Sequence, residues 1–261
     1  MAYAASLFRY PVKSMQGERV ERLEFAEPSA TGDRRWALLD VESGLYLSAK
    51  RHGRLLEASA RTEPDGAVVI RLPDGSELEA ADPAASARLS DWLGRAVELR
   101  RPTGATSPSY EGLDDALDEG SGTHTFSGST THFADFADVH LLTTASLLAA
   151  KALRPSSDWD VRRFRPTMLL ETGDEQVGFV EDAWIGSRVI VGGGATFEVF
   201  MKTIRCNLPT RSQPGLERDT AVARLLRNEH EFCLGVYGAF RRGGLVATGD
   251  PVTIDGGPSA S

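Results

Sequence analysis

Residues 187–200 read SRVIVGGGATFEVF, and this stretch decides the expected fold. Two runs rich in β-branched and aromatic residues, 187–191 and 196–200, flank three consecutive glycines. Runs of this kind joined by a short glycine turn are typical of a β-hairpin, because glycine readily adopts the positive φ angles of tight turns. The sequence therefore predicts an antiparallel pair of strands in the second half of the chain.

The strand pattern continues towards both ends of the chain. Further strands are expected at residues 5–10, 19–25, 35–41, 67–72, 77–80, 97–100, 139–142, 167–171, 234–240 and 245–247. Helical patterns cover residues 83–93, 145–153 and 220–228. Candidate N-caps precede them at Asp82, Thr143 and Asp219. The predicted fold class is a β-rich α+β protein with a barrel-like architecture.

The predicted elements form two halves around residues 101–131. This segment is rich in Pro, Gly, Ser and Thr and holds the acidic run EGLDDALDEG, which favours a linker or a long surface loop. We interpret the acids as a solvated face, with a docking surface for a basic partner as the alternative. The expected organisation is one domain over residues 1–100, a second over 132–255 and a tail at 256–261.

The composition is that of a soluble globular protein with an acidic surplus. A net charge of -8 over 261 residues argues against nucleic acid as a partner. No stretch is apolar and long enough to cross a membrane, and no secretory signal is recognisable. The two cysteines, Cys206 and Cys233, are too few for a disulfide framework or an iron–sulfur cluster. We therefore expect a cytoplasmic protein without such a cluster in this chain.

Four short motifs could each bind an anion, although each has a simpler interpretation. Lys13 and Ser14 follow a predicted strand, where a lysine beside a hydroxyl can bind phosphate or simply be exposed. Arg34 lies in an Asp-Arg-Arg-Trp stretch, which is also typical of a surface ion pair. The helix start at 143–146 has free N–H groups, which a cap alone can satisfy. Three arginines at 162–166 are equally compatible with a solvated edge.

Cys206 is the candidate reactive thiol. It follows Arg205 where a strand pattern breaks into a loop, and an adjacent cation favours the thiolate form. A thiolate is a soft metal ligand and a nucleophile, whereas the alternative is a buried, inert cysteine. We expect Cys233, flanked by Phe232 and Leu234, to be inert. The five histidines lack the spacing of a zinc helix.

The chain resembles the MOSC-domain proteins over nearly its whole length outside residues 101–131. The similar blocks, in family order, are LFRYPVKSMQG, GDRRWALLD, LYLSAKRHGRLL, HLLTTASL, RRFRPTMLLE, FVEDAWIGSRVIVGG, IRCNLPT, LGVYGAF and GGLVATGDPVTI. The resemblance implies an N-terminal MOSC-type β-barrel domain followed by a MOSC β-barrel domain with a few helices.

Relatives of the amidoxime-reducing type bind a molybdenum–molybdopterin cofactor, and the resemblance carries their site onto this chain. Cys206 matches the cysteine that binds the metal and is the one catalytic residue implied. The residues implied to bind the cofactor are Lys13, Ser14, Arg34, Thr144, Ser146, Arg165, Arg205, Cys206 and Thr210. Several of them fall in the four motifs that could bind an anion.

The resemblance also implies an activity. It would be a molybdenum-dependent reduction of small N-hydroxylated molecules, such as amidoximes or hydroxylamines. Electrons would come from a separate ferredoxin, flavoprotein or cytochrome, because this chain has no second redox centre. Two alternatives stay open: a carrier of sulfur or of the cofactor that uses Cys206, and a non-catalytic interaction module.

The match departs from the family pattern beside the proposed metal ligand. Relatives often have Thr-Thr-x-Asp after the cysteine motif, whereas this chain reads RCNLPTRS, with Pro209 and Ser212 at two of those positions. Thr167 replaces an asparagine that usually follows Phe-Arg-Pro. Cofactor binding is expected to survive these changes, but the acid–base groups around the metal are expected to differ.

Overall fold

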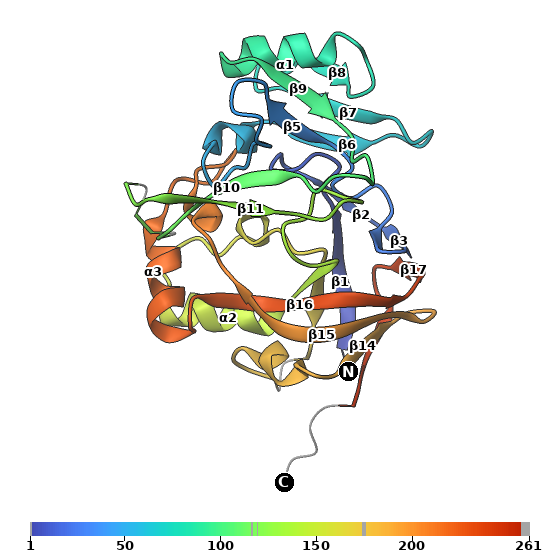
Figure 1. Cartoon of the computed structure of the whole chain (residues 1–261). Helices are drawn as coiled ribbons and strands as arrows, with labels where there is room; N and C mark the ends of the chain where they lie inside the picture. Colours follow the sequence, from blue (N-terminus) through green and yellow to red (C-terminus); the bar gives the residue numbers. More distant parts are fainter. Residues whose placement is uncertain (1, 116, 119, 174–175, 257–261) are drawn as a thin grey trace.

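A closed seven-stranded β-barrel forms the lower part of the computed structural model, which describes residues 2–115, 117–118, 120–173 and 176–256 (Figure 1). The strands follow one another in the order β13-β12-β16-β15-β14-β18-β1, and β1 pairs again with β13. Their bounds are β1 Ala2–Arg9, β12 Val139–Thr143, β13 Met168–Glu171, β14 Arg188–Val191, β15 Ala195–Ile204, β16 Cys233–Arg242 and β18 Pro251–Asp255. Only β12 and β13 are parallel; all other neighbours in the barrel are antiparallel.

The barrel is closed by a strand from the other end of the chain. β1 lies between β18 and β13, with Ala2 opposite Val252 and Leu7 opposite Met168. Both edges of β1 are paired, so neither β13 nor β18 has an open edge. The second half of the chain is thus completed by the first few residues of the first half.

The predicted hairpin at 187–200 is confirmed as β14 and β15. Gly192 and Gly194 in its turn have φ angles of 55° and 114°, which explains the need for glycine there. Val189 and Phe197 are fully buried in the barrel core. Phe25 packs edge-on against Phe197, with ring centroids 4.8 Å apart, and so joins the N-terminal segment to this core.

A smaller part of the molecule lies above the barrel in Figure 1 and has its own core. It holds the pair β5–β9, the sheet β6-β7-β8, one helix and a 3-10 segment. Their bounds are β5 Ala37–Asp40, η1 Gly53–Glu57, β6 Ser59–Thr62, β7 Val68–Arg71, β8 Glu77–Glu79, α1 Ala85–Leu93 and β9 Val97–Arg100. Gly94 ends α1 in the left-handed conformation. Asp82 is not its N-cap; Ala84 is, and the Asp82 carboxylate instead accepts the Ala84 N–H.

Short strands connect the two parts. β2 (Glu18–Val20) pairs with β1, and the sheet β17-β3-β4 joins Gly244–Ala247, Arg22–Ala26 and Ser29–Ala30. The run 19–25, expected as one strand, is therefore divided between β2 and β3, which belong to different sheets. This division allows one segment to serve both the barrel and the connecting sheet.

Two helices cover one side of the barrel. α2 (Thr144–Leu153) and α3 (Thr220–Glu229) pack over a small apolar core that includes Leu142 and Leu226. Thr143 and Asp219 cap them through the Ser146 and Ala221 N–H groups, as the sequence predicted. Three 3-10 segments lie nearby, η2 Val161–Arg163, η3 Val180–Trp184 and η4 Leu208–Thr210. Among the described residues, no helix combines the length and apolar character needed to span a membrane.

The segment 101–131, expected to be a linker or surface loop, contains a β-hairpin. Its strands are β10 (Ser109–Leu113) and β11 (Thr123–Ser127). Tyr110 is fully buried, with its ring 5.3 Å from that of Phe126, so aromatic packing orders a segment whose composition favours a loop. The acidic run lies largely between these strands, where Asp115 pairs with Arg227 of α3 at 2.6 Å. The hairpin thus forms a cover over the barrel.

Candidate functional site

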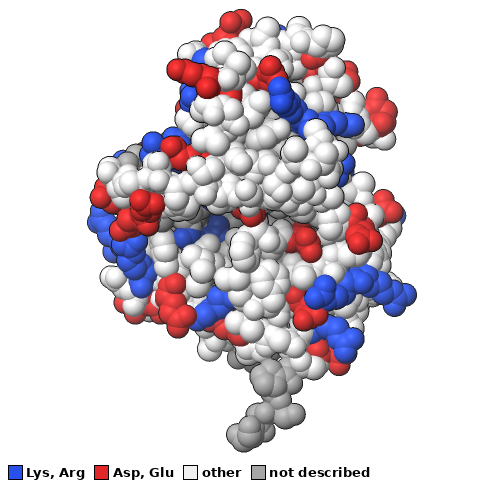
Figure 2. Space-filling model, in the orientation of Figure 1, with Lys and Arg blue, Asp and Glu red and all other residues white. Residues whose placement is uncertain are grey.

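A cavity of about 510 Å³ lies between the barrel, the smaller part and the β10–β11 hairpin. Figure 2 shows a hollow in this face with basic side chains inside it. The loop after β1, the hairpin and the loop before β12 contribute to its wall, as do the end of β15 and the middle of β16. Segments from the whole length of the chain therefore meet in one place.

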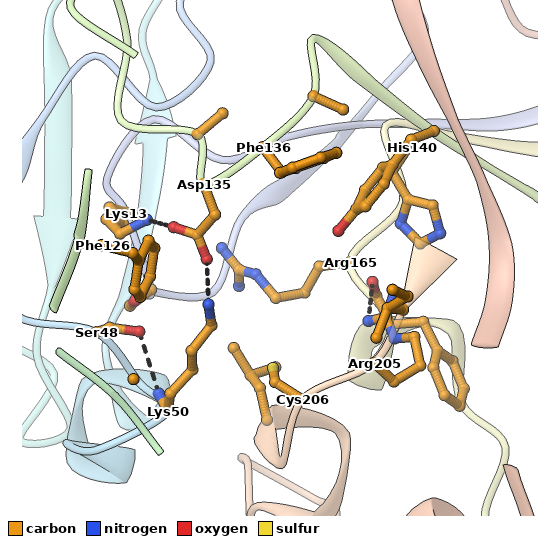
Figure 3. A pocket seen from close by; sticks show the side chains of 18 of the residues that line it. Lys13, Ser48, Lys50, Phe126, Asp135, Phe136, His140, Arg165, Arg205 and Cys206 are labelled. Atoms are coloured by element: carbon orange, nitrogen blue, oxygen red, sulfur yellow. Dashed lines mark hydrogen bonds and ion pairs between the residues drawn. The ribbon is translucent and has the colours of Figure 1, made fainter. Parts of the chain in front are cut away.

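One wall of the cavity is a cluster of cations around a single carboxylate. Lys13 Nζ pairs with Asp135 and donates to the Phe133 carbonyl at 2.9 Å. Lys50 Nζ lies 2.7 Å from the other oxygen of Asp135 (Figure 3). The rings of Tyr110 and Phe126 lie under the two ammonium groups, at 4.1 and 4.6 Å. We call Lys13, Lys50 and Asp135 the lysine–aspartate bridge.

Burial and charge act differently on the members of this bridge. Burial lowers the pKa of Lys13 to about 8, although Asp135 opposes the shift. Burial acts to lower the pKa of Lys50, but its interactions with Asp135, Cys206 and Tyr237 together outweigh burial and raise it. The two lysines hold the pKa of Asp135 well below its usual range despite burial. The bridge therefore holds two cations against one anion at neutral pH, and so favours a further anion.

Two arginines continue the cationic wall. Arg34 pairs with Asp33, and its guanidinium lies 5.0 Å from the centre of the Tyr10 ring. Arg165 lies 4.1 Å from the same ring and donates to the Met15 carbonyl at 2.6 Å. Burial lowers the pKa of Arg165 to about 10, so it is charged at neutral pH.

The backbone of this wall is strained. Ser14, Arg34 and Arg165 have φ angles of 68°, 47° and 54°, a region that side-chain-bearing residues adopt at a cost. All three line the cavity. The Ser14 hydroxyl also accepts the N–H of Ala49 at 2.9 Å. Strain that is concentrated on one cavity wall is typical of a functional site.

Cys206 lies on the cavity wall between Lys50 and Arg205 in Figure 3. Its side chain is half-buried, whereas Cys233 is buried outside the cavity. Arg205 donates to the Phe164 carbonyl at 2.9 Å, while its buried Nε has no hydrogen-bond partner among the described residues. The thiol and an unsatisfied donor thus stand side by side on the wall.

Arg163 fixes the loop that follows Cys206. It is 1% exposed and donates to the carbonyls of Pro209, Arg211 and Glu217 at 3.1, 3.3 and 2.9 Å. A buried guanidinium needs such acceptors, because leaving it unsatisfied is costly. Sequence reasoning missed this role, since Arg163 was one of three neighbouring arginines without a distinguishing feature.

Six residues implied by the resemblance line the cavity, but three do not. The six are Lys13, Ser14, Arg34, Arg165, Arg205 and Cys206. Ser146 is fully buried and donates to the Glu181 carboxylate at 2.6 Å, and Thr144 donates to Glu171 at 2.8 Å. Thr210 donates to the Asn207 carbonyl at 2.7 Å. Their hydroxyls are engaged within the protein, and we leave these three out of the site.

Other lining residues were not singled out from the sequence. Lys50 and Asp135 meet across 85 positions of the chain, and no local motif marks Asp135. Tyr237 also lines the cavity. His140 is buried and 3.3 Å from the Leu234 carbonyl, and it contributes to the wall as well. Burial in its case lowers the pKa well below the usual range.

The fold and the site define a class: a two-part β-barrel protein whose cavity combines one cysteine with a cationic wall. Residues 1–98 match the MOSC N-terminal beta barrel domain, and residues 128–253 match the MOSC domain. The chain therefore belongs to the MOSC-domain family. No curated protein matched it in a comparison of sequences.

Two solved structures were similar at low sequence identity. The YUAD protein from Bacillus subtilis is 12% identical over 97% of this chain and 94% of that chain, with a TM-score of 0.49. YiiM from Geobacillus stearothermophilus is 13% identical over 45% of this chain and 54% of that chain, with a TM-score of 0.33.

Proposed function

We propose that this protein binds a molybdenum–molybdopterin cofactor through Cys206 and reduces small N-hydroxylated compounds. MOSC domains are associated with the molybdenum cofactor, which gives the general role. The observation that carries the proposal is a half-buried thiol and a cationic wall in one cavity. The thiol suits a soft metal, and the wall suits the phosphate of the pterin.

The residues present fit such a cofactor. Cys206 supplies the metal ligand, and the lysine–aspartate bridge, Arg34 and Arg165 supply positive charge. The buried Nε of Arg205 has no partner within the described part of the chain, and a polar group of the cofactor would satisfy it. When bound, the cofactor would supply two-electron oxygen-transfer chemistry that no side chain of this protein can perform.

The overall reaction balances with one external reductant. An N–OH group takes up two electrons and two protons, the N–O bond breaks, and an N–H product and water leave. The electrons would come from a separate ferredoxin, flavoprotein or cytochrome. The protein's own contribution would be to orient the substrate and to limit water through the β10–β11 cover. Lys13, with a pKa of about 8, can also hold or release a proton near neutral pH.

Metal content tests the proposal directly. The protein is produced in a host that makes the molybdenum cofactor, beside Cys206→Ser and the matched control Cys233→Ser. We expect near-stoichiometric molybdenum in the parent and the control, and a loss of at least about tenfold in Cys206→Ser. Turnover of an N-hydroxylated substrate with a reduced dye should follow the metal. A folded parent without molybdenum would overturn the proposal.

A sulfur or cofactor carrier is the second candidate, because Cys206 is partly exposed and could bear a persulfide. Mass spectrometry of the intact protein distinguishes the two. A sulfur adduct on Cys206 without molybdenum would favour the carrier. Molybdenum with turnover, and no adduct, would favour the reductase.

A further inference from the structure

Three aromatic rings lie together beside the cavity. Phe136 lies 5.8 Å from Tyr237 and 6.1 Å from Phe200, and Phe200 lies 6.5 Å from Tyr237, measured between ring centroids. Tyr237 and Phe136 line the cavity, as do the apolar side chains of Met201 and Ile204. We call these five residues the aromatic shelf.

A β-bulge aims part of the shelf outward. Val199 pairs with Gly238 and Met201 pairs with Tyr237, so Phe200 is an extra residue in β15 without a partner. Such a bulge breaks the alternation of the strand and redirects side chains, and bulges are frequent beside active sites. Phe200 is therefore turned away from the barrel core, which its neighbour Val199 occupies.

The shelf exposes more apolar surface than packing requires. Phe136 is 66% exposed, Ile204 58% and Phe200 40%. Phe136 and Ile204 line the cavity, and Phe200 lies beside Phe136, whereas isolated exposed apolar residues are normal on a protein surface. A contiguous apolar patch at a cavity is typical of a ligand-binding surface.

Charge is separated across the cavity. Figure 3 shows Lys13 and Lys50 on one side of the cavity, whereas Phe136 lies above Arg165 and Cys206 below it. An anion would bind to the bridge, where the cations are, whereas the shelf favours a neutral apolar group. Cys206 is two residues from Ile204 of the shelf, so a molecule on the shelf lies beside the proposed metal position.

We infer that the aromatic shelf binds the substrate, and that it selects N-hydroxylated compounds in which the group that bears the N–OH is attached to a planar aryl ring. This inference rests on the proposed function for the reaction, but not for the binding. A flat ring can stack on Phe136, whose face is open to solvent, at the spacing that aromatic pairs prefer. The pterin is a poorer occupant, because its polar edge needs hydrogen bonds that Phe136, Met201 and Ile204 cannot give.

Kinetics of the molybdenum-loaded protein test the selection. Benzamidoxime and acetamidoxime, an aryl and a small aliphatic substrate, are compared with a reduced dye as donor. In Phe136→Ala we expect KM for benzamidoxime to rise about tenfold, and KM for acetamidoxime and the molybdenum content to stay unchanged. Tyr237→Phe keeps the ring and should keep the preference for the aryl substrate. Leu148→Ala, an exposed residue of α2, is the control.

A binding measurement separates the shelf from the reaction. Benzamide and acetamide, which are not reduced, are titrated into the loaded protein without an electron donor and followed by NMR. We expect benzamide to bind more tightly than acetamide. Phe136→Ala should lower the affinity for benzamide about tenfold. Equal affinities for the two amides, or an unchanged affinity for benzamide in Phe136→Ala, would overturn the inference that the shelf binds aryl groups.

The remaining outcomes are also distinguishable. Loss of molybdenum in Phe136→Ala would assign the ring to the cofactor and overturn the inference. A loaded parent that reduces neither amidoxime but binds benzamide through Phe136 would overturn the proposed reaction while supporting the shelf.

Discussion

At the scale of single residues, Asp135 places one carboxylate among the cations of the wall, where it pairs with Lys13 and Lys50. Its carboxylate holds Lys13 and Lys50 together in a position that either lysine alone, on its flexible stem, would not keep. The same carboxylate competes with any incoming anion for these two ammonium groups. The wall is therefore preorganised, but the net charge that a ligand experiences is smaller than the number of cations would indicate.

Lys13 gives this wall a dependence on pH. Its pKa is lowered to about 8, with burial as the main cause, so the ammonium loses its proton as the pH rises through that value. Anion binding should then weaken, because the attraction is present below about pH 8 and lost above it. Sulfate is a suitable probe, since its own charge is constant there. We expect its affinity, measured by calorimetry, to fall about fivefold between roughly pH 7 and pH 9.

The matched variant for this prediction is Lys13→Arg. Arginine remains charged over the whole interval, so the affinity of the variant should be flat. An equal fall in parent and variant would show that another group causes the pH dependence.

Some residues of the site can be predicted from a local sequence motif, and others cannot. Cys206 and Arg205 form a motif within the chain, and Lys13 and Ser14 do so as well, so a local pattern predicts them. Asp135 has no such pattern, because its function comes only from contact with lysines that are distant in sequence. Local reasoning does not decide the role of Thr144, since a hydroxyl at a helix start can serve the fold as well as a ligand.

At the scale of elements, the loop after Cys206 depends on one buried guanidinium. η4 and the residues that follow it have few regular backbone hydrogen bonds, and Arg163 compensates by donating to three of their carbonyls. These three hydrogen bonds hold the loop next to Cys206 in place, although the loop contains no strand and no long helix.

Arg163→Met should therefore destabilise the protein. We expect the free energy of unfolding, measured with urea, to fall by about 3 kcal/mol, because three hydrogen bonds to carbonyls, one buried and two partly buried, are lost. Arg162→Met is the control: its guanidinium is 42% exposed and pairs with Asp160, so its loss should cost at most about 0.5 kcal/mol. Equal effects of the two substitutions would contradict the proposed role of Arg163.

Elements were predictable where apolar periodicity and turn residues agree. The hairpin of β14 and β15 has both, and its glycines meet the φ angles that the turn requires. The β10–β11 hairpin has a polar, acidic sequence, and it is ordered by contacts of Tyr110 and Phe126 with distant rings. Such contacts are invisible to a window of neighbouring residues, which is why the segment was expected to be a loop.

At the scale of the whole molecule, both halves of the chain contribute strands to the barrel. β1 comes first in sequence but closes the barrel built by the last part of the chain, and Ala4 and Leu7 are fully buried in its core. The matches to two family domains along the sequence do not reveal this exchange, because pairing between distant strands leaves no local pattern. The cavity also depends on both halves of the chain, because residues from each half form its wall.

The barrel should not form a stable closed structure without β1. Residues 128–256 alone would leave β13 and β18 each with an unpaired edge, and the barrel core would lack Ala4 and Leu7. We expect this fragment to show no cooperative unfolding transition in urea by circular dichroism. Fusing residues 1–20 behind residue 256 through a short Gly-Ser linker should restore the transition, because Ala2 lies opposite Val252 and the ends are close. The same fusion with Leu7→Asp, a charge in the barrel core, should fail to restore it. A cooperative transition in the unfused fragment would show instead that the barrel closes without β1.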